Sequence, residues 1–259
     1  MANYIEVDDA IGMSGLRVVL TPGVPGPWSE AAKGILHVKK IPYVKVRQEL
    51  GGANLPLQRW SAQTTAPVFA YNDERPRSLW SDQLFLAERL EPNPPLIPAN
   101  LKDRALMFGF ANEICGETGL GWARRLMLLH PALSNPNAPE AARKFSAHMG
   151  NKYGYNHAAA EAAPARTAEI LTALAEQLAS QHAAGSRFLI GGQLSALDIY
   201  WSTFAALIDP LPDNLCPMPA NFRRMYQCED PVIRAALAPQ LLAHRDFIYH
   251  EYLELPVDL

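Results

Sequence analysis

Two places in the chain combine the start of a predicted helix with side chains that can contact an anion. At the first, Gly26-Pro27-Trp28-Ser29, a helical pattern begins near the hydroxyls of Ser29 and Thr21. At the second, Ser81-Asp82-Gln83, residues with N-cap character precede another helical pattern. A helix start presents free N–H groups and a partial positive charge. Groups of this kind can hold a carboxylate or stabilise a thiolate.

The cysteines offer a different chemistry, which their spacing disfavours. Cys115, Cys216 and Cys228 lie far apart and form neither a CxxC pair nor a metal-ligand pattern. We therefore expect three buried, reduced thiols, no disulfide and no metal site.

Composition limits the class of protein. The chain has 259 residues, 49% of them hydrophobic and 19% charged, so it can bury a substantial core. A formal net charge of −3 without a basic cluster disfavours nucleic acid as a partner. The N-terminus is acidic where a signal peptide is basic, and no apolar run is long enough to cross a membrane. We expect a cytoplasmic protein that does not contact a membrane.

The first helix must be positioned by a βαβ unit. After a leader over residues 1–15, Leu16–Leu20 predicts a buried strand, and the proline-rich and glycine-rich segment after it predicts a loop. The helical pattern that starts at Trp28 is ended by Pro42, and Tyr43–Val46 predicts a second strand. Strand, helix and strand in so short a span indicate a parallel pair.

The second helix start follows a predicted hairpin. Residues 49–65 are irregular, and Pro67–Tyr71 with Leu79–Trp80 predict two antiparallel strands. Ser81 and Asp82 then predict the N-cap of a helix that reaches Leu90.

A proline-rich stretch over residues 92–99 predicts the linker between two domains. Residues 1–91 form the first domain of this prediction, and residues 100–259 form an all-helical second domain. Within the second domain the helical patterns cover residues 105–114, a glycine-broken continuation to 130, then 140–149 and 166–182.

Four local patterns, taken in chain order, resemble those of one superfamily. Gly26-Pro27-Trp28-Ser29, followed by Lys40-Ile41-Pro42-Tyr43, is similar to the S-P-F-S or C-P-F-C opening and downstream G-V-P-Y of the glutathione transferases. Thr65-Ala66-Pro67-Val68-Phe69 is similar to their K-V-P-V-L. In that motif the proline is cis, and the residue before it pairs its backbone with the cysteinyl part of glutathione.

The other two patterns lie further along. The segment from Asp82 to Leu90 resembles E-S-x-A-I-x-x-Y-L, whose first two residues bind the γ-glutamyl group. The segment from Phe188 to Ile199 resembles F-L-x-G-x-x-x-S-x-A-D-I. In it, Ser195 and Asp198 predict a capping box that stabilises a buried helix by about 1 kcal/mol.

The resemblance covers nearly the whole chain and implies an α/β plus all-α fold. A thioredoxin-like N-terminal domain (βαβ-ββα) would bind glutathione, and the helical domain would hold a small apolar electrophile. The resemblance also implies a homodimer. The residues it assigns to glutathione are Trp28, Thr65, Ala66, Pro67, Asp82 and Gln83. Trp28 is expected to pack over the glutathione or between the domains.

The sequence departs from the family at the catalytic position. Family members activate the thiol with a Tyr near the end of the first strand or a Ser or Cys at the start of the first helix, where this chain has Gly26. Exchange chemistry through a protein cysteine is therefore disfavoured. Ser29 is the nearest hydroxyl and Thr21 a second candidate for stabilising the thiolate, and the alternative for Ser29 is that it caps the helix.

The acceptor pocket is expected between the domains, against the first helices of the second one. Met107, Phe110, Ile114 and Trp122 are candidates for its wall, with burial in the core as the alternative. Three nearby glycines predict a break in the helix, and Tyr153, Tyr155 and His157 are further polar candidates.

These residues favour transfer of glutathione to an electrophile. Glutathione-dependent ether cleavage, dehalogenation or isomerisation needs the same thiolate, so the sequence does not separate these reactions. A glutathione-binding protein without catalysis is the third possibility.

Overall fold

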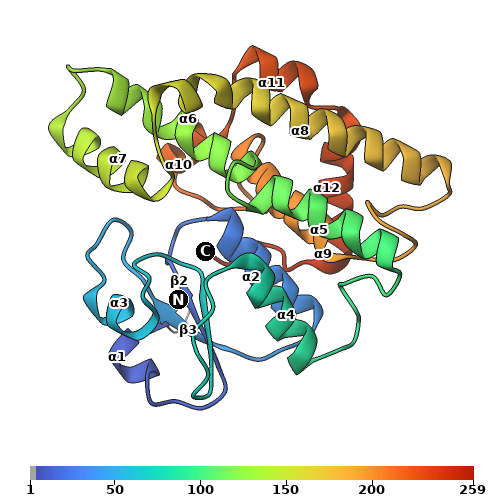
Figure 1. The fold of residues 1–259 in the computed structure, drawn as a ribbon, viewed down its shortest axis with the longest axis horizontal. Coiled ribbons are helices and arrows are strands. Elements are labelled where there is room, and N and C mark those ends of the chain that lie inside the picture. Colours follow the sequence, from blue (N-terminus) through green and yellow to red (C-terminus); the bar gives the residue numbers. More distant parts are fainter. Residues whose placement is uncertain (1–3) are drawn as a thin grey trace.

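The computed structural model describes residues 4–259, which form a part with a sheet, below in Figure 1, and a helical part above it. We call residues 4–91 the N-terminal part and residues 100–259 the C-terminal part. The sheet has the strand order β1-β3-β2-β4. β3 is parallel to both β1 and β2, and β4 is antiparallel to β2. The strands are Tyr4–Ile5 (β1), Leu16–Leu20 (β2), Val44–Arg47 (β3) and Val68–Tyr71 (β4).

The predicted βαβ unit is present. Helix α2, Pro27–Val38, connects β2 to the parallel strand β3, with Val19 opposite Val46. Pro27 occupies the first helical position, where its missing N–H costs no hydrogen bond. All residues of β2 are buried, as a central strand covered on both faces requires.

The predicted leader is part of this sheet rather than an appendage. β1 pairs with β3, and helix α1, Val7–Ala10, follows it. Val7 and Ala10 are buried in a small cluster with Val19, Val46, Leu57 and Val68. Two strand residues and one helical turn are too short to produce a periodic sequence pattern, so neither element could be predicted. Residues 1–3 lie outside the described part.

The region between β3 and helix α4, Trp80–Leu90, differs from the prediction in two ways. Helix α3, Leu55–Ser61, forms in the segment predicted to be irregular, anchored by the fully buried Leu57. The predicted second hairpin strand, Leu79–Trp80, does not form, because Leu79 is the N-cap of α4 and Trp80 is its first residue. Phe69 pairs instead with Arg77 in a single bridge, whose two hydrogen bonds are 2.7 and 2.8 Å. Pro76 carries no N–H, so the pairing cannot extend through it as a regular ladder.

Helix α4 spans Trp80–Leu90 and begins earlier than predicted. The Gln83 N–H donates to the Leu79 carbonyl at 3.0 Å, which makes Leu79 the N-cap. Ser81 and Asp82 are therefore in the first helical turn and do not cap it, which corrects that prediction.

The C-terminal part is helical, as predicted. The break around the glycines falls between Cys115 and Leu120, and Gly121 lies just inside the second of the two helices. The helices are α5 Leu101–Cys115, α6 Leu120–Ser134, α7 Glu140–Lys152, α8 His157–Ala183, α9 Ala196–Phe204, the 3-10 turn η1 Ala205–Leu207, α10 Ala220–Tyr226, α11 Pro231–Ala236 and α12 Pro239–Tyr252.

One hydrophobic core runs across both parts. It contains residues of β2, α2 and α4 together with residues of α5, α8, α9 and α12. α2 packs directly on α9, where a Cβ at Gly34 would lie 3.1 Å from the Ile199 side chain. The interface between the two parts is thus a continuation of the core, which fixes their relative position.

Two segments fasten this interface. The buried Lys39 ammonium donates to the carbonyls of Glu91 and Pro94, at 2.8 and 2.9 Å, and so holds the start of the linker. The segment after α12 returns to the N-terminal part, where the Asp258 carboxylate pairs with Lys45. Near it, the Val257 N–H donates to the Leu215 carbonyl at 2.7 Å.

Cys115, Cys216 and Cys228 are buried and unpaired, as predicted. Burial raises the pKa of the Cys115 thiol, and chiefly burial raises that of Cys216 to about 11. Neither thiol is placed to act as a nucleophile.

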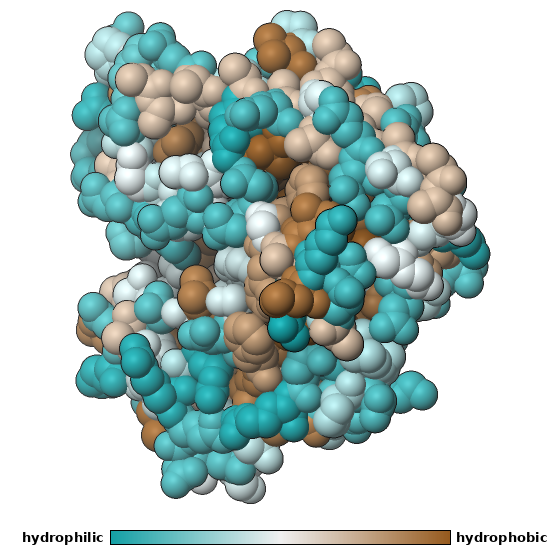
Figure 2. Space-filling model, turned by 45° about the vertical axis from the view of Figure 1, so that its right-hand side comes forward, coloured by the Kyte–Doolittle hydropathy of each residue, from teal (hydrophilic) through white to brown (hydrophobic). Residues whose placement is uncertain are grey.

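Within residues 4–259, no helix combines the length and the apolar character that a bilayer crossing needs. The face in Figure 2 is mostly hydrophilic, and hydrophobic residues gather near its middle, where the helical part meets the part with the sheet.

Candidate functional site

A cavity of about 550 Å³ lies between the N-terminal part and the helical wall formed by α6, α7 and α10. The N-terminal part contributes the start of α2 and the loops that carry Thr21, Gln48 and Thr65. A volume of this size, with mainly apolar lining and a few polar groups, is typical of a small-molecule site.

The start of α2 opens into this cavity. Gly26 is the N-cap, and the first N–H bonded within the helix is that of Glu30, which donates to the Gly26 carbonyl at 2.9 Å. The N–H groups of Trp28 and Ser29 precede it and have no partner inside the helix. With the helix dipole, they make this end of the cavity favourable for an anion.

Ser29 and Thr21 both line the cavity. Ser29 is the third residue of α2, so the alternative that it caps the helix is wrong: Gly26 occupies that position. The Thr21 hydroxyl already donates to the side-chain carbonyl of Gln48. Because the Gln48 amide in turn donates to the Thr64 carbonyl, at 3.2 Å, Thr21 belongs to a network that holds the loops together.

Trp28 stands at the meeting point of the two parts. Its indole N–H donates to the Cys115 carbonyl at the end of α5, at 2.9 Å. Its ring meets Phe204 of α9 edge-on, with centroids 4.8 Å apart. It also lines the cavity, so the expected packing between domains is combined with a position beside the helix start.

The segment from Thr65 to Pro67 forms a second edge of the cavity. The Ala66–Pro67 bond is cis, as the resemblance implied, and Thr65 and Ala66 line the cavity. β4 begins only at Val68, so the Ala66 backbone lies outside the ladder. The buried Gln83 side chain donates to the Pro67 carbonyl at 3.2 Å and fixes the turn from behind.

Asp82 and Gln83 do not line this cavity. Gln83 is buried and points its amide at the carbonyls of Pro67 and Arg77. Asp82 lies beside a smaller hollow next to residues 75–79. The structure thus brings together Thr21, Trp28, Ser29, Thr65 and Ala66, and it places the start of α4 behind them.

The expected acceptor wall needs correction. Met107 and Ile114 are fully buried in the core, because α5 turns its apolar face toward α9. Phe110 packs against the same core. Trp122 is held by a hydrogen bond from its indole to the Tyr153 carbonyl, at 2.9 Å. The apolar lining of the cavity comes instead from α6, α7 and α10 and includes Leu128, Leu129, Phe145, Met149, Phe222 and Met225.

Two cationic side chains face the cavity, and sequence reasoning missed both. Arg125 of α6 lies 5.9 Å from the Trp28 ring centroid and 5.6 Å from that of Tyr226. It donates to the Tyr226 hydroxyl at 3.3 Å, and its Nε is buried without a hydrogen-bond partner. The only sequence signal was a pair of arginines, Arg124 and Arg125, within an otherwise apolar helix. Arg124 is buried, and its guanidinium donates to the Leu207 carbonyl at 2.8 Å.

Lys152, the last residue of α7, closes the cavity against the N-terminal part. Its ammonium donates to the Thr65 hydroxyl at 2.5 Å and lies 5.5 Å from the Tyr153 ring centroid. Although much of the residue is exposed, desolvation of its ammonium, together with the nearby Arg125 charge, lowers the pKa of Lys152 to about 8.

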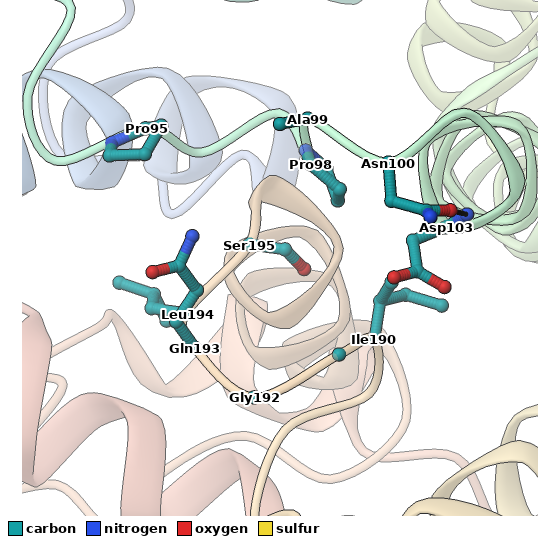
Figure 3. Close-up of a pocket in the computed structure, with 11 residues that line it drawn as sticks. Pro95, Pro98, Ala99, Asn100, Asp103, Ile190, Gly192, Gln193, Leu194 and Ser195 are labelled. Atoms are coloured by element: carbon teal, nitrogen blue, oxygen red, sulfur yellow. Dashed lines mark hydrogen bonds between the residues drawn. The ribbon is translucent and has the colours of Figure 1, made fainter.

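A second hollow, shown in Figure 3, lies between the linker and the loop before α9. Its polar groups have structural roles. The Asn100 side chain caps α5 through the N–H groups of Lys102 and Asp103. Ser195 and Asp198 form the predicted capping box of α9, with Asp198 accepting from the Ser195 N–H and hydroxyl at 2.8 Å each.

No protein-family model matches the chain, and no curated protein matches it in sequence. Solved structures do. A glutathione S-transferase domain-containing protein from Marinobacter aquaeolei matches with a TM-score of 0.60 and 16% identity, over 92% of this chain and 100% of that one. Rice GST1 in complex with glutathione matches with a TM-score of 0.58 and 18% identity, over 94% and 93% of the two chains.

The fold is that of the glutathione transferases. A Tau class glutathione S-transferase from mango agrees with this, with a TM-score of 0.51 and 18% identity over 93% of this chain and 99% of that one. In the glutathione transferase fold of this chain, a thioredoxin-like sheet of four strands is followed by the helical part. Among residues 4–259, no cluster of three or more His, Cys, Asp or Glu side chains is arranged to hold a metal ion.

Proposed function

We propose that the chain is a glutathione transferase that binds glutathione as a thiolate at the start of α2 and transfers it to a small electrophile. The observation that carries the proposal is the position of that helix start. Its unpartnered N–H groups open into an enclosed, largely apolar cavity beside a cis-proline turn. The fold similarity to glutathione complexes supports the choice of ligand.

The residues on both edges of the cavity fit a tripeptide of this kind. The Ala66 backbone, outside the strand ladder, can pair with the cysteinyl backbone in the manner of an added strand. The sulfur then lies toward Trp28 and Ser29. We assign the γ-glutamyl end to the start of α4 near Asp82 and Gln83, which lies outside this cavity beside the smaller hollow at Asp82. There the Trp80, Ser81 and Asp82 N–H groups precede the first helical hydrogen bond.

The thiolate needs no protein nucleophile, because the enzyme has only to lower the pKa of the bound thiol. The helix dipole and free N–H groups act in that direction. Ser29 can add a hydrogen bond, since it lines the cavity and does not cap the helix. Thr21 is less available because its hydroxyl donates to Gln48.

Binding and turnover test the proposal separately. Saturating glutathione should raise the melting temperature and perturb the amides of Ala66 and Ser29. A turnover assay with several aromatic halides should then show conjugation above the uncatalysed rate. If glutathione leaves both the melting temperature and these amides unchanged, the proposal is wrong.

The role of Ser29 has its own test. Ser29→Ala should lower the conjugation rate and shift its pH profile upward, because one hydrogen bond to the thiolate is lost. Thr21→Val is the matched control and should loosen the loops without moving the pH profile. An unchanged profile in Ser29→Ala would assign thiolate stabilisation to the backbone alone.

Gly26 favours a second candidate function. With no Ser, Cys or Tyr at the family's catalytic position, the chain can bind glutathione without turning it over. Binding without turnover across several halides would establish this role. Ether cleavage, dehalogenation and isomerisation use the same thiolate and would appear as turnover of other substrates.

We also propose a homodimer in the cytoplasm. Large apolar side chains are exposed on and beside α4 and on α5: Leu79 (54%), Phe85 (53%), Leu101 (70%) and Leu106 (39%). Phe85 stacks on Phe108 with ring centroids 5.4 Å apart, which joins the two helices into one apolar surface. Light scattering should give twice the mass of the chain, and Phe85→Glu should reduce it to one.

A further inference from the structure

Arg125 is a partly buried cation without an acidic partner. In the described part of the chain, no carboxylate forms a salt bridge with it, and its Nε has no hydrogen-bond partner. Its polar neighbours are the phenol groups of Tyr226 and Tyr153, and it also lies over the faces of Trp28 and Tyr226. Placing a guanidinium in an apolar cavity is costly unless an anion pairs with it.

The other charged side chain that lines the cavity is also positive. Its described lining includes Arg125 and Lys152 and no Asp or Glu. The nearest first-turn carboxylate of α2, Glu30, is buried and pairs with Lys33 at 2.9 Å beside a different hollow. The cavity therefore attracts anions and offers them a planar, bidentate donor.

The apolar side chains of the same helical wall determine what accompanies the anionic group. Phe145, Met149, Phe222 and Met225 present aromatic and thioether surfaces. These side chains suit an apolar or aromatic ring. Arg125 lies 5.9 Å from the ring of Trp28, so a group bound to it would sit within a few bond lengths of the start of α2.

We propose that the second substrate of this cavity carries a carboxylate on an aromatic body and that Arg125 binds this carboxylate. The proposal rests on the proposed function for the identity of the other substrate. In this proposal the carboxylate that Arg125 binds belongs to the second substrate and not to glutathione. Arg125 belongs to the helical wall with Tyr226, whereas the glutathione contacts proposed above come from Ala66 and the start of α2.

A pair of isosteric probes tests this. Binding of 4-chloro-3-nitrobenzoate and of 4-chloro-3-nitrobenzamide to the full chain is measured by calorimetry, with and without saturating S-methylglutathione, which cannot react. The benzoate should bind at least about tenfold more tightly than the amide. Equal affinity for the two probes would overturn the proposal.

Variants locate the effect. Arg125→Met should weaken benzoate binding by about ten- to a hundredfold and leave amide binding nearly unchanged. Arg125→Lys should retain part of the preference and covers the case in which Arg125→Met does not fold. Lys144→Met is the control, because Lys144 is on the same α7 wall helix as Lys152 but is exposed and paired with Glu140. It should behave as wild type.

The two proposals fail in different ways. If S-methylglutathione does not bind the wild type but the benzoate preference follows Arg125, the glutathione transferase function is wrong and the anion site stands. If Arg125→Met instead weakens S-methylglutathione and leaves the benzoate preference intact, Arg125 serves glutathione and the inference is overturned.

Discussion

Adding a methyl group at Gly121 tests the packing that fixes Trp28 at the edge of the cavity. A Cβ there would lie 2.5 Å from Phe204 Cε1 and 2.8 Å from Trp28 Cη2 and Cζ2. Carbon atoms pack best at about 3.5–4.0 Å, so an alanine would overlap these rings by about 1 Å. Neither ring can move freely, since Phe204 is fully buried and the Trp28 indole is bonded to the Cys115 carbonyl.

The expected size follows from two opposing terms. Overpacking a filled core costs about 1–3 kcal/mol, and alanine in place of glycine in a helix contributes about 0.5–1 kcal/mol of stability. Gly121→Ala should therefore lower the free energy of unfolding by about 1–2 kcal/mol. Gly109 is the matched control, because it is exposed within α5 and an added Cβ meets nothing within 4 Å. Gly109→Ala should raise the free energy of unfolding by about 0.5–1 kcal/mol.

Urea denaturation at one protein concentration, followed by tryptophan fluorescence and circular dichroism, measures both variants. A change of opposite sign in the two is the expected result. If Gly121→Ala were as stable as the wild type while Gly109→Ala gained stability, α6 would not press on Trp28 as the structure shows, and the reasoning would be refuted.

Two further predictions concern buried and titrating charge. Asp198→Ala leaves the buried N–H groups of Leu189 and Ser195 without their acceptor. It should lower the free energy of unfolding, measured by urea denaturation, by about 3–5 kcal/mol. Ser195→Ala should lower it by only about 1 kcal/mol. Desolvation and the Arg125 charge lower the pKa of Lys152 to about 8, so its positive charge is lost as the pH rises from about 7 to 9. The affinity of the wild type for the benzoate should therefore fall about two- to fivefold over that pH range. In Lys152→Met it should stay level, because Arg125 remains charged. A fall of the same size in Lys152→Met would show that Lys152 is not the titrating group.

The fold could be predicted from local signals because those signals are long or chemically specific. The buried run Leu16–Leu20, the helical pattern from Trp28 and the Ser195–Asp198 box each determine a local conformation. The structure confirms all three, with the helix beginning one residue earlier, at Pro27. Helix α3 could not be predicted, since a helix of seven residues with one buried anchor has no measurable period. The start of α4 was placed too late because its N-cap, Leu79, has no capping side chain, whereas its predicted end at Leu90 is correct.

The candidate site was predicted only on its N-terminal side. Gly26 and the Ala66–Pro67 turn belong to local motifs, so position along the chain was enough to place them. The helical wall depends on which face of each helix meets which neighbour, and this is a tertiary property. Met107 and Arg125 illustrate this. Met107 is apolar and packs in the core against α9, whereas Arg125 is charged and lines the cavity.

The segment after α12 has a consequence for how the cavity can vary. Asp258 ties it to Lys45 of the sheet, and Val257 ties it to Leu215 in the helical part, beside the middle of α2 and away from the cavity at the start of that helix. Because it is bonded to both, the segment resists rotation of the N-terminal part against the C-terminal part. A change in the size of the cavity would therefore come from individual wall side chains such as Phe145 rather than from a rotation of one part against the other.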